Sequence, residues 1–267
     1  MPDVRHVLSL SGGKDSSALA IYTRDRVPGM EYVFCDTHKE LQETYDYLDR
    51  LEVYLGKPIV RLSDERGFDH WLEVFHGYLP SSRMRWCTKL LKIRPFEKYV
   101  GDDPVRMYIG IRGDEDRTAY ISTKDNITAA YPFKEDGIDE AGVHRILEES
   151  GMGLPAYYQW RTRSGCYFCF FQRRKEWVEL MRRHPALFEL AKAYEKSDPE
   201  RDLRFTWNER ESLEELSRPE RVAQIDADHE KRMKAERAHR PNRPLIEVLA
   251  DVYDDENDDE PCLMCQL

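Results

Sequence analysis

The 267-residue sequence contains no run of about eighteen consecutive apolar residues, which is the length that a membrane-spanning helix needs. Its first residues lack the apolar stretch of a secretory signal. No segment repeats, and the two common phosphate-binding fingerprints, the Walker loop and the dinucleotide G-x-G-x-x-G pattern, are both missing. These absences favour a cytoplasmic protein with no membrane partner, built as one large domain or a domain and a smaller region.

Basic residues are not in excess either. The formal net charge is −10, but the segment 251–260, DVYDDENDDE, carries seven acidic residues and no basic one. Without that segment, 44 acidic residues face 41 basic ones. The body of the chain is therefore nearly balanced and lacks the strong basic footprint of an autonomous DNA-binding protein. The acidic segment is expected to be disordered.

Cysteines are few but unevenly placed. Two Cys-x-x-Cys pairs, GCYFC and the terminal CLMC, accompany the single residues Cys35 and Cys87. In a cytoplasmic protein such pairs indicate metal or redox use rather than structural disulfides. Cys35 ends the apolar run YVFC and is expected to be a small buried residue.

The stretch VRHVLSLSGGKDSSALAIY joins a predicted strand to a predicted helix. Residues 4–10 suit a short buried strand, and residues 16–22 have the small and apolar spacing of a helix packed on a sheet. Gly12 and Gly13 between them let backbone N–H groups approach a ligand, and the helix start adds partial positive charge. The turn therefore predicts a phosphate site, although Gly-Gly pairs also make tight turns without a ligand.

Strand and helix patterns alternate up to about residue 140, which predicts a doubly wound, mostly parallel α/β sheet. Strands are expected at 4–10, 31–36, 58–62 and 105–111, and helices at 15–26, 39–55 and 88–100. In such sheets ligands bind at the carboxyl ends of the strands, where SGGKDS and CDTHKE both fall. Beyond residue 140 the pattern is helical with no further strands; helices are expected over 142–150, 176–184, 185–197 and 217–239.

The six residues Ser11 to Ser16 resemble the pyrophosphate loop of the ATP pyrophosphatase superfamily, whose members split ATP between its α and β phosphates. The resemblance to phosphoadenosine phosphosulfate reductases is wider. CDTHKELQETYDYLDRLEVYLGKPIVRL, GIRGDEDR and LPAYYQWRTRSGCYFC are similar to segments of those reductases, in the same order. Together these motifs cover roughly residues 5–170. They imply an adenine nucleotide α-hydrolase-like fold, with a nucleotide-binding domain at 1–138, a helical region at 139–249 and a flexible tail at 250–267.

Two departures separate this chain from true sulfonucleotide reductases. Their first loop lacks the lysine and aspartate that stand here as Lys14 and Asp15, and they end in a Glu-Cys-Gly-Ile-His type tail, whereas this chain ends in PCLMCQL. The run SGCYFCFFQRRKEW looks like the DndC or SspD type of DNA phosphorothioation systems. That resemblance implies an ATP pyrophosphatase that adenylates an oxygen of the DNA backbone phosphate, which sulfur from a cysteine desulfurase then replaces, together with other phosphorothioation proteins.

The charge that develops on the substrate and the resemblance together indicate which residues form the nucleotide site. Negative charge gathers on the α-phosphate in the transition state, so cations and hydrogen-bond donors are the main need. The expected catalytic residues are Lys14, Asp15, Ser16 and Arg112, with Asp15 also helping to hold Mg²⁺. The residues expected to bind ATP are Ser9, Ser11, Gly12, Gly13, Lys14, Asp15, Ser16, Asp36, Thr37, Gly110, Arg112 and Arg117. Plainer alternatives are that Asp36 caps the next helix and that the two arginines pair with the acidic residues between them. His38 and His144 are expected to be solvated or core residues.

The cysteines fit a 4Fe-4S cluster on the reductase pattern, in which two adjacent cysteines precede a lysine and a proline. Aligning Lys92 and Pro95 on that pattern puts Cys87 at the first cysteine and Thr88 at the second. Cys166 and Cys169 follow at a matching separation. The fourth ligand is open: Cys262 or Cys265 supplies it, or sulfide binds there. A structural zinc is the alternative metal at such a pair.

DNA is an expected partner, although the chain as a whole is acidic. The basic residues expected near the cysteines are Arg161, Arg163, Arg173, Arg174, Lys175, Arg83, Arg85, Lys89, Lys92 and Arg94. If these residues lie on one rim of the fold, they form a local positive face that binds DNA. The alternative is that a partner protein delivers the DNA. The alternative functions are a sulfonucleotide reductase, a tRNA thiolation enzyme and a cluster-bearing nucleotide sensor without turnover.

Overall fold

The computed structural model describes residues 4–116, 124–198, 203–208 and 210–237. Two compact units divide the described chain. The first contains residues 4–73, 85–116 and 124–166, and the second contains residues 74–84 together with those from Tyr167 onward. The boundary at residue 138 expected from the sequence stays a prediction. The compact units divide after Cys166 because the helix Glu140–Glu149 packs against the helix Lys14–Thr23 of the first unit.

The first unit is built on a parallel five-stranded sheet. Its strands are β1 (Arg5–Leu10), β2 (Met30–Cys35), β3 (Ile59–Leu62), β4 (Val105–Tyr108) and β5 (Ile127–Ala130). They lie in the order β3-β2-β1-β4-β5, so that Leu8 at the centre pairs with Tyr32 on one side and Tyr108 on the other. The chain leaves β1 toward β3 and returns to β4 on the opposite side. Ligands bind at such a switch point, here the carboxyl ends of β1 and β4.

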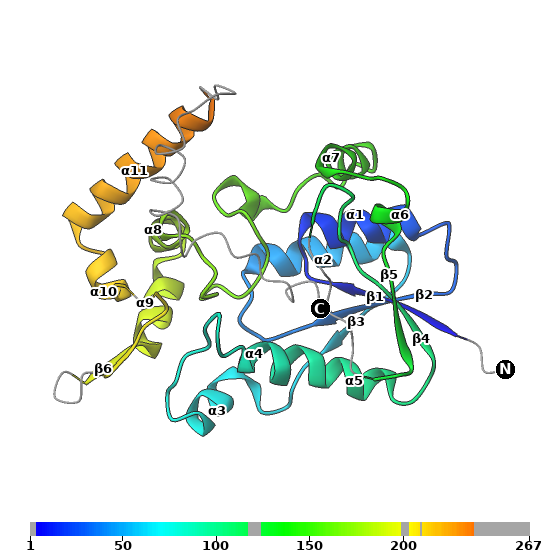
Figure 1. Cartoon of the computed structure of the whole chain (residues 1–267), viewed down its shortest axis with the longest axis horizontal. Helices are drawn as coiled ribbons and strands as arrows, with labels where there is room; N and C mark the ends of the chain where they lie inside the picture. The colour runs from blue at the N-terminus through cyan, green and yellow to red at the C-terminus, as the bar shows by residue number, and fades with distance from the viewer. Residues whose placement is uncertain (1–3, 117–123, 199–202, 209, 238–267) are drawn as a thin grey trace. The chain divides into compact units, whose positions relative to one another are not determined.

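Alternation along the strands sends side chains to two faces, each covered by helices (Figure 1). Leu8 and Leu10 belong to the core that α1 (Lys14–Thr23), α2 (Gln42–Leu55) and α7 (Glu140–Glu149) cover. Val7, with Val33 and Met107, belongs to the core under α5 (Arg94–Val100). The doubly wound α/β fold expected from the sequence is therefore confirmed.

Short elements complete the first unit. They are α3 (Gly67–Val74, whose last residue is assigned to the second unit), α4 (Trp86–Thr88), the π-helical segment Lys89–Ile93, α6 (Pro132–Glu135) and the 3₁₀ turn Ala156–Gln159. The strand β5 was not expected from the sequence. Ile127–Ala130 is a four-residue edge strand with two β-branched residues followed by two alanines, so it shows little of the residue pattern that marks a strand.

The second unit is mainly helical, as expected. Its elements are α8 (Arg174–Arg183), α9 (Pro185–Tyr194), β6 (Lys196–Asp198), β7 (Leu203–Phe205), α10 (Leu213–Leu216) and α11 (Pro219–Arg237). Its core stacks Phe168 on Trp207, with Trp177 and Phe188 also buried. The expectation of no strand beyond residue 140 was wrong, because β6 and β7 pair as a short antiparallel hairpin whose three-residue strands are too short to show a period.

The basic residues expected to form a positive face are partly used inside their own units. Arg161 is buried and donates hydrogen bonds to the carbonyls of Gly165 and Cys166, so its place on that face was wrong. In the second unit, Arg174 pairs with Glu211 and Lys175 pairs with Glu179 and Asp226. A DNA-binding face therefore stays a prediction for the remaining residues. Among the described helices, none has the length and apolar character to cross a membrane.

Candidate functional site

The turn between β1 and α1, residues 11–16, forms the cradle at which the sequence predicts a phosphate site. Gly12 has a φ of +73°, and a Cβ there would lie 2.6 Å from Thr44 Cγ2. A Cβ on Gly13 would lie 2.9 Å from Ser164 Oγ. The two glycines therefore allow both the backbone conformation and the close approach of neighbouring side chains. The first amides of α1 have no acceptor within the helix, so they are available to acceptors outside it.

Three serine hydroxyls lie together in this turn. Ser11 Oγ is 3.1 Å from Ser16 Oγ, and Ser164 Oγ donates to Ser11 Oγ at 3.2 Å. Ser11 N and Gly13 N also donate to hydroxyls within the turn. Ser11 and Ser16 were expected from the sequence, whereas Ser164 comes from the segment before Cys166 and was missed. Serine is so common in loops that its sequence carries no signal of this contact.

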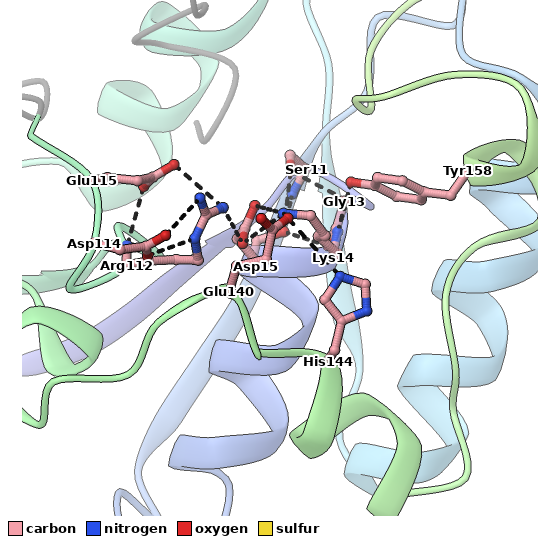
Figure 2. Close-up of polar contacts among 11 residues, drawn as sticks. Ser11, Gly13, Lys14, Asp15, Arg112, Asp114, Glu115, Glu140, His144 and Tyr158 are labelled. Carbon is pink, nitrogen blue, oxygen red and sulfur yellow. Dashed lines mark hydrogen bonds and ion pairs between the residues drawn. The ribbon is translucent and has the colours of Figure 1, made fainter. Parts of the chain in front are cut away.

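Lys14, Asp15 and Arg112 meet at the mouth of the cradle (Figure 2). Asp15 Oδ1 lies 3.3 Å from Lys14 Nζ and 3.2 Å from an Arg112 guanidinium nitrogen, so one carboxylate holds both cations. Arg112 comes from the loop after β4, and the structure thus joins two switch-point loops that are about 100 residues apart in sequence. Gly110 permits this approach, because a Cβ there would lie 3.0 Å from the carbonyl oxygen of Asp15.

Acidic neighbours complete the charge balance of the site. Arg112 also pairs with Asp114 and Glu115, as the plainer reading of the sequence expected. Burial lowers the pKa of Arg112, but the hydrogen bond to Asp114 and the charges of Asp15 and Glu115 raise it overall. Arg112 therefore stays charged at any working pH, and so retains the charge that a phosphate needs.

Glu140 and Tyr158 contact the cradle and were missed by the sequence analysis (Figure 2). Glu140, in the first turn of α7, lies 3.0 Å from Lys14 Nζ, and this hydrogen bond lowers the pKa of Glu140. Tyr158 accepts a hydrogen bond from the backbone N–H of Lys14 at 3.0 Å, while Tyr157 donates to the carbonyl of Gly12 at 2.7 Å. No sequence pattern marks an exposed glutamate for a contact with Lys14. The adjacent tyrosines in LPAYYQW were a weak sequence signal for the contact of Tyr158.

Asp36 organises the turn after β2. It is buried, and its Oδ1 accepts hydrogen bonds from the N–H of His38 at 2.7 Å and from the hydroxyl of Tyr45 at 2.8 Å. Burial and the contact with Asp36 raise the pKa of Tyr45. The alternative that Asp36 caps the next helix was wrong, because α2 begins after Leu41. His38 is solvated, as expected, at a positive φ of 57°.

Thr37 and Cys166 lie beside the buried carboxylate of Glu40. Thr37 Oγ1 donates to Glu40 Oε1 at 3.0 Å and lies 3.1 Å from Cys166 Sγ. The Cys166 thiol donates to the same Glu40 oxygen at 3.6 Å. Thr37 was expected to bind nucleotide, a role that stays a prediction, and Glu40 was not expected at all.

The other cysteines differ in burial. Cys35 is buried, which raises the pKa of its thiol to about 12, so it is the inert core residue that the sequence predicted. Cys87 and Cys169 are partly exposed, and Cys87 Sγ lies 4.0 Å from the hydroxyl of Thr88. No group of three or more histidine, cysteine or acidic side chains in the described ranges is arranged as a metal site.

Some expected site residues are not placed at the cradle. Ser9 is buried in β1, and its hydroxyl has no hydrogen-bond partner among the described residues. Arg117, Cys262 and Cys265 lie outside the described residues. His144 is partly exposed and lies 4.0 Å from Glu140. The roles expected for Ser9, Arg117 and the terminal cysteines stay predictions.

Comparisons with known proteins point to one family of domains. Residues 5–130 match the family model described as the phosphoadenosine phosphosulfate reductase domain. An uncharacterized protein of Methanocaldococcus jannaschii is 28% identical over 197 residues, which are 68% of this chain and 40% of that protein. A second one from the same organism is 24% identical over 194 residues, 67% of this chain and 45% of that protein. The chain thus spans less than half the length of these two relatives.

A reductase appears among the curated relatives and among the solved structures. Adenosine 5'-phosphosulfate reductase of Staphylococcus haemolyticus is 27% identical over 113 residues, 42% of this chain and 46% of that protein. The crystal structure of phosphoadenylyl-sulfate reductase from Candida auris has a TM-score of 0.51 at 13% identity, over 61% of this chain and 82% of that chain. That likeness concerns the fold. The chain therefore contains a nucleotide-binding domain similar to the phosphoadenosine phosphosulfate reductase domain.

Proposed function

We propose that this chain is an ATP pyrophosphatase. An acceptor oxygen attacks the α-phosphorus of ATP, the bond from that phosphorus to the α–β bridging oxygen breaks, and pyrophosphate leaves while AMP stays on the acceptor. The observation that carries the proposal is the convergence of Lys14, Asp15 and Arg112 on the N-terminus of α1. Both cations and the backbone amides of the turn suit a polyphosphate, whose charge must be balanced as the bridging bond breaks.

Each residue of the cradle has a role in this reaction. Lys14 binds the β or γ oxygens as a point charge, and Arg112 binds a phosphate through its planar fork. The hydroxyls of Ser11 and Ser16 and the amides of Gly12 and Gly13 donate to phosphate oxygens. Asp15 would supply a carboxylate ligand to Mg²⁺, and that ion would neutralise charge on the phosphates. Ser9, Asp36, Thr37, Gly110 and Arg117 complete the proposed nucleotide site.

We propose DNA backbone phosphate as the acceptor, in a DNA phosphorothioation system. A phosphate oxygen is a poor leaving group, and attaching AMP makes it part of a better one before sulfur enters. A cysteine desulfurase and other phosphorothioation proteins are the proposed partners, and DNA binds directly or arrives with one of them. The resemblance of SGCYFCFFQRRKEW to the DndC or SspD type supports this acceptor.

We further propose a 4Fe-4S cluster with Cys87, Cys166 and Cys169 as ligands. Each of the three is partly exposed, unlike the inert Cys35, and Cys166 has a buried carboxylate beside it. Thiolates are the usual ligands of such a cluster. The three cysteines are not grouped as a metal site in the described residues. When bound, the cluster would supply sulfur or redox chemistry.

A sulfonucleotide reductase is a second candidate. The family match and the Staphylococcus haemolyticus reductase among the relatives favour it. It would bind an already adenylated sulfate at the same cradle and release sulfite. Retention of Lys14 and Asp15 favours ATP cleavage instead, because an adenylated sulfate carries no β-phosphate for the lysine to bind.

The first experiment measures phosphate products with ATP and Mg²⁺, alone and with DNA or tRNA added. Pyrophosphate and AMP are expected, and Lys14→Ala should lower their rate by about 100-fold or more, because it removes a positioned cation. Lys98→Ala, at a lysine whose side chain is 83% exposed in the same unit, is the matched control and should not change the rate. ADP and orthophosphate as products would contradict the proposal.

The second experiment identifies the acceptor. Mass spectrometry of DNA and tRNA nucleosides from cells with and without the gene should show phosphorothioate linkages in DNA only when the gene is present. Thiolated tRNA bases would support a tRNA enzyme. Sulfite formed from adenylyl sulfate or its 3′-phosphorylated form, with thioredoxin, would support the reductase. ATP binding with none of these products would indicate a nucleotide sensor.

A further inference from the structure

Ser164 reaches the turn between β1 and α1 from the segment that leads to Cys166. Only 7% of this serine is exposed, and its hydroxyl donates to Ser11 Oγ at 3.2 Å. Gly13 allows the approach, because a Cβ there would lie 2.9 Å from Ser164 Oγ. Ser164 and the turn both belong to the first unit. A residue 153 positions along the chain from Ser11 therefore lies against the proposed phosphate site.

The three serine hydroxyls of the cradle form one chain of donors. Each hydroxyl has a single proton to donate. Ser164 donates to Ser11. Ser16 donates to the carbonyl of Gly13 at 3.3 Å, which leaves Ser11 as the donor in its contact with Ser16. Rotation about a C–O bond turns each proton toward an outside acceptor without moving the backbone, so all three hydroxyls are available to an anion that offers several oxygens.

The hydroxyl of Ser164 is not needed to hold its own segment. Upstream, Tyr157 donates to the carbonyl of Gly12 at 2.7 Å. The buried guanidinium of Arg161 donates to the carbonyls of the two residues that follow Ser164. These contacts fix the segment on both sides of the serine. A hydrogen bond between two neutral hydroxyls is weaker than one to a charged phosphate, so the Ser164 hydroxyl contributes more to phosphate binding than to the fold.

We propose that Ser164 is a third phosphate-binding hydroxyl of the cradle, beside Ser11 and Ser16, and couples occupancy of the cradle to the segment that carries Cys166. The inference rests on the proposed polyphosphate site. When phosphate binds, Ser164 turns its proton from Ser11 to a phosphate oxygen. The amides of residues 161–166 then open less often, because the bound anion ties their segment to the turn.

The test uses the full chain with inorganic pyrophosphate as the probe, so that it does not depend on turnover. Three proteins are compared: the unchanged chain, Ser164→Ala, and Ser150→Ala as the matched control. Ser150 is a partly buried serine of the same unit, whose hydroxyl bonds to the carbonyl of Leu147 and the N–H of Met152. Isothermal titration gives the Kd, and urea unfolding gives the stability. Hydrogen exchange followed by mass spectrometry gives the protection of residues 161–166 with and without pyrophosphate.

Ser164→Ala should weaken pyrophosphate binding by about 10-fold, because it removes a hydrogen bond to a charged group. It should lose no more stability than Ser150→Ala, whose Kd should equal that of the unchanged chain. Saturating pyrophosphate should slow exchange in residues 161–166 about 10-fold or more in the unchanged chain and in Ser150→Ala. Most of that protection should be missing in Ser164→Ala.

Two outcomes would overturn the inference while leaving the polyphosphate site intact. One is an unchanged Kd for pyrophosphate in Ser164→Ala. The other is a lack of protection in residues 161–166 of the unchanged chain at saturating pyrophosphate, which decides the matter even if Ser164→Ala does not fold. If the unchanged chain binds neither pyrophosphate nor ATP, the site and this residue fail together. Release of pyrophosphate from ATP, measured separately, decides the ATP pyrophosphatase.

Discussion

Lys14 shows how the protein's own acceptors occupy the donors of the proposed phosphate site. Its ammonium contacts Asp15 and Glu140, and its backbone N–H is bound by Tyr158. A nucleotide that uses these donors must replace protein acceptors with phosphate oxygens. Binding therefore exchanges contacts, and the groups that are displaced weaken the apparent affinity.

Glu140→Gln should tighten ATP binding, because Lys14 then no longer has to break its ion pair with Glu140 in order to bind a phosphate. The Glu140 side chain is 53% exposed, so the gain should be modest, about two- to five-fold in Kd. Isothermal titration with ATP or pyrophosphate measures it. Glu148→Gln, near the other end of the same helix, is the control. A weaker Kd would show that Glu140 assists the nucleotide instead.

Tyr158→Phe tests the hydroxyl at the helix start. Without it the amide of Lys14 loses its acceptor, and the nucleotide-free protein should be less stable by about 1 kcal/mol in urea unfolding. Bound phosphate supplies an acceptor to the same amide, so saturating ATP should restore most of that stability. Tyr54→Phe, a partly buried tyrosine elsewhere in the first unit, is the control. If ATP protects the variant less than the unchanged chain, Tyr158 remains a ligand in the bound state.

At the scale of elements, the site depends on how closely the loop after β4 approaches α1. A side chain at Gly110 would press on the backbone of Asp15, which cannot move without shifting the first turn of the helix. The approach brings Arg112 to Asp15 and so joins the two loops of the switch point.

Gly110→Ala should therefore lower both stability and nucleotide affinity. Overpacking of this kind costs about 1–3 kcal/mol, measurable by urea unfolding at neutral pH. Gly29→Ala is the matched control, because a Cβ at Gly29 meets nothing within 4 Å, and it should change stability by less than about 0.5 kcal/mol. Equal effects of the two substitutions would show that the approach of the loop is not constrained.

At the scale of the molecule, ion pairs in the helical second unit predict sensitivity to acid. The hydrogen bond from Arg182, with help from Lys175, lowers the pKa of Asp226 to about 2, although burial opposes it. Burial also raises the pKa of Glu179, but hydrogen bonds from Lys175, Arg183 and Arg182 lower it to about 2. A carboxyl whose pKa is lower when folded adds stability above its unfolded value and loses it as pH falls toward the folded value.

Lys175→Met should accordingly cost more stability at pH 7 than at about pH 2.5, where part of the ion-pair contribution is already lost. The measurement is the free energy of urea unfolding at both values, followed by tryptophan fluorescence. Lys231→Met, at an exposed position on α11, is the control and should show little effect at either pH. An equal loss at both values would indicate that Lys175 acts by packing and not by charge.

Much of this molecule follows from local patterns. The buried strands of the sheet, the glycine turn and the main helices each carry a period or a residue type that short-range physics dictates, so the sequence predicted β1 to β4, the cradle and its Lys14 and Asp15. The helices at the C-terminal end were predicted for the same reason. Short strands such as β5 and β6 were not, because three or four residues hold too little pattern to separate them from loops.

Only the tertiary structure decided which distant residues meet. Tyr158, Ser164 and Glu140 reach the cradle from segments more than 120 residues away, and no local pattern marks an ordinary tyrosine, serine or glutamate for that contact. The same is true of Glu40, whose buried carboxylate accepts a hydrogen bond from the thiol of Cys166, a residue far away in the sequence. The sequence by itself determined the chemistry available to this protein, because that depends on residue types and near neighbours. The tertiary structure decided the partners of each charge, because burial and proximity exist only once the chain has folded.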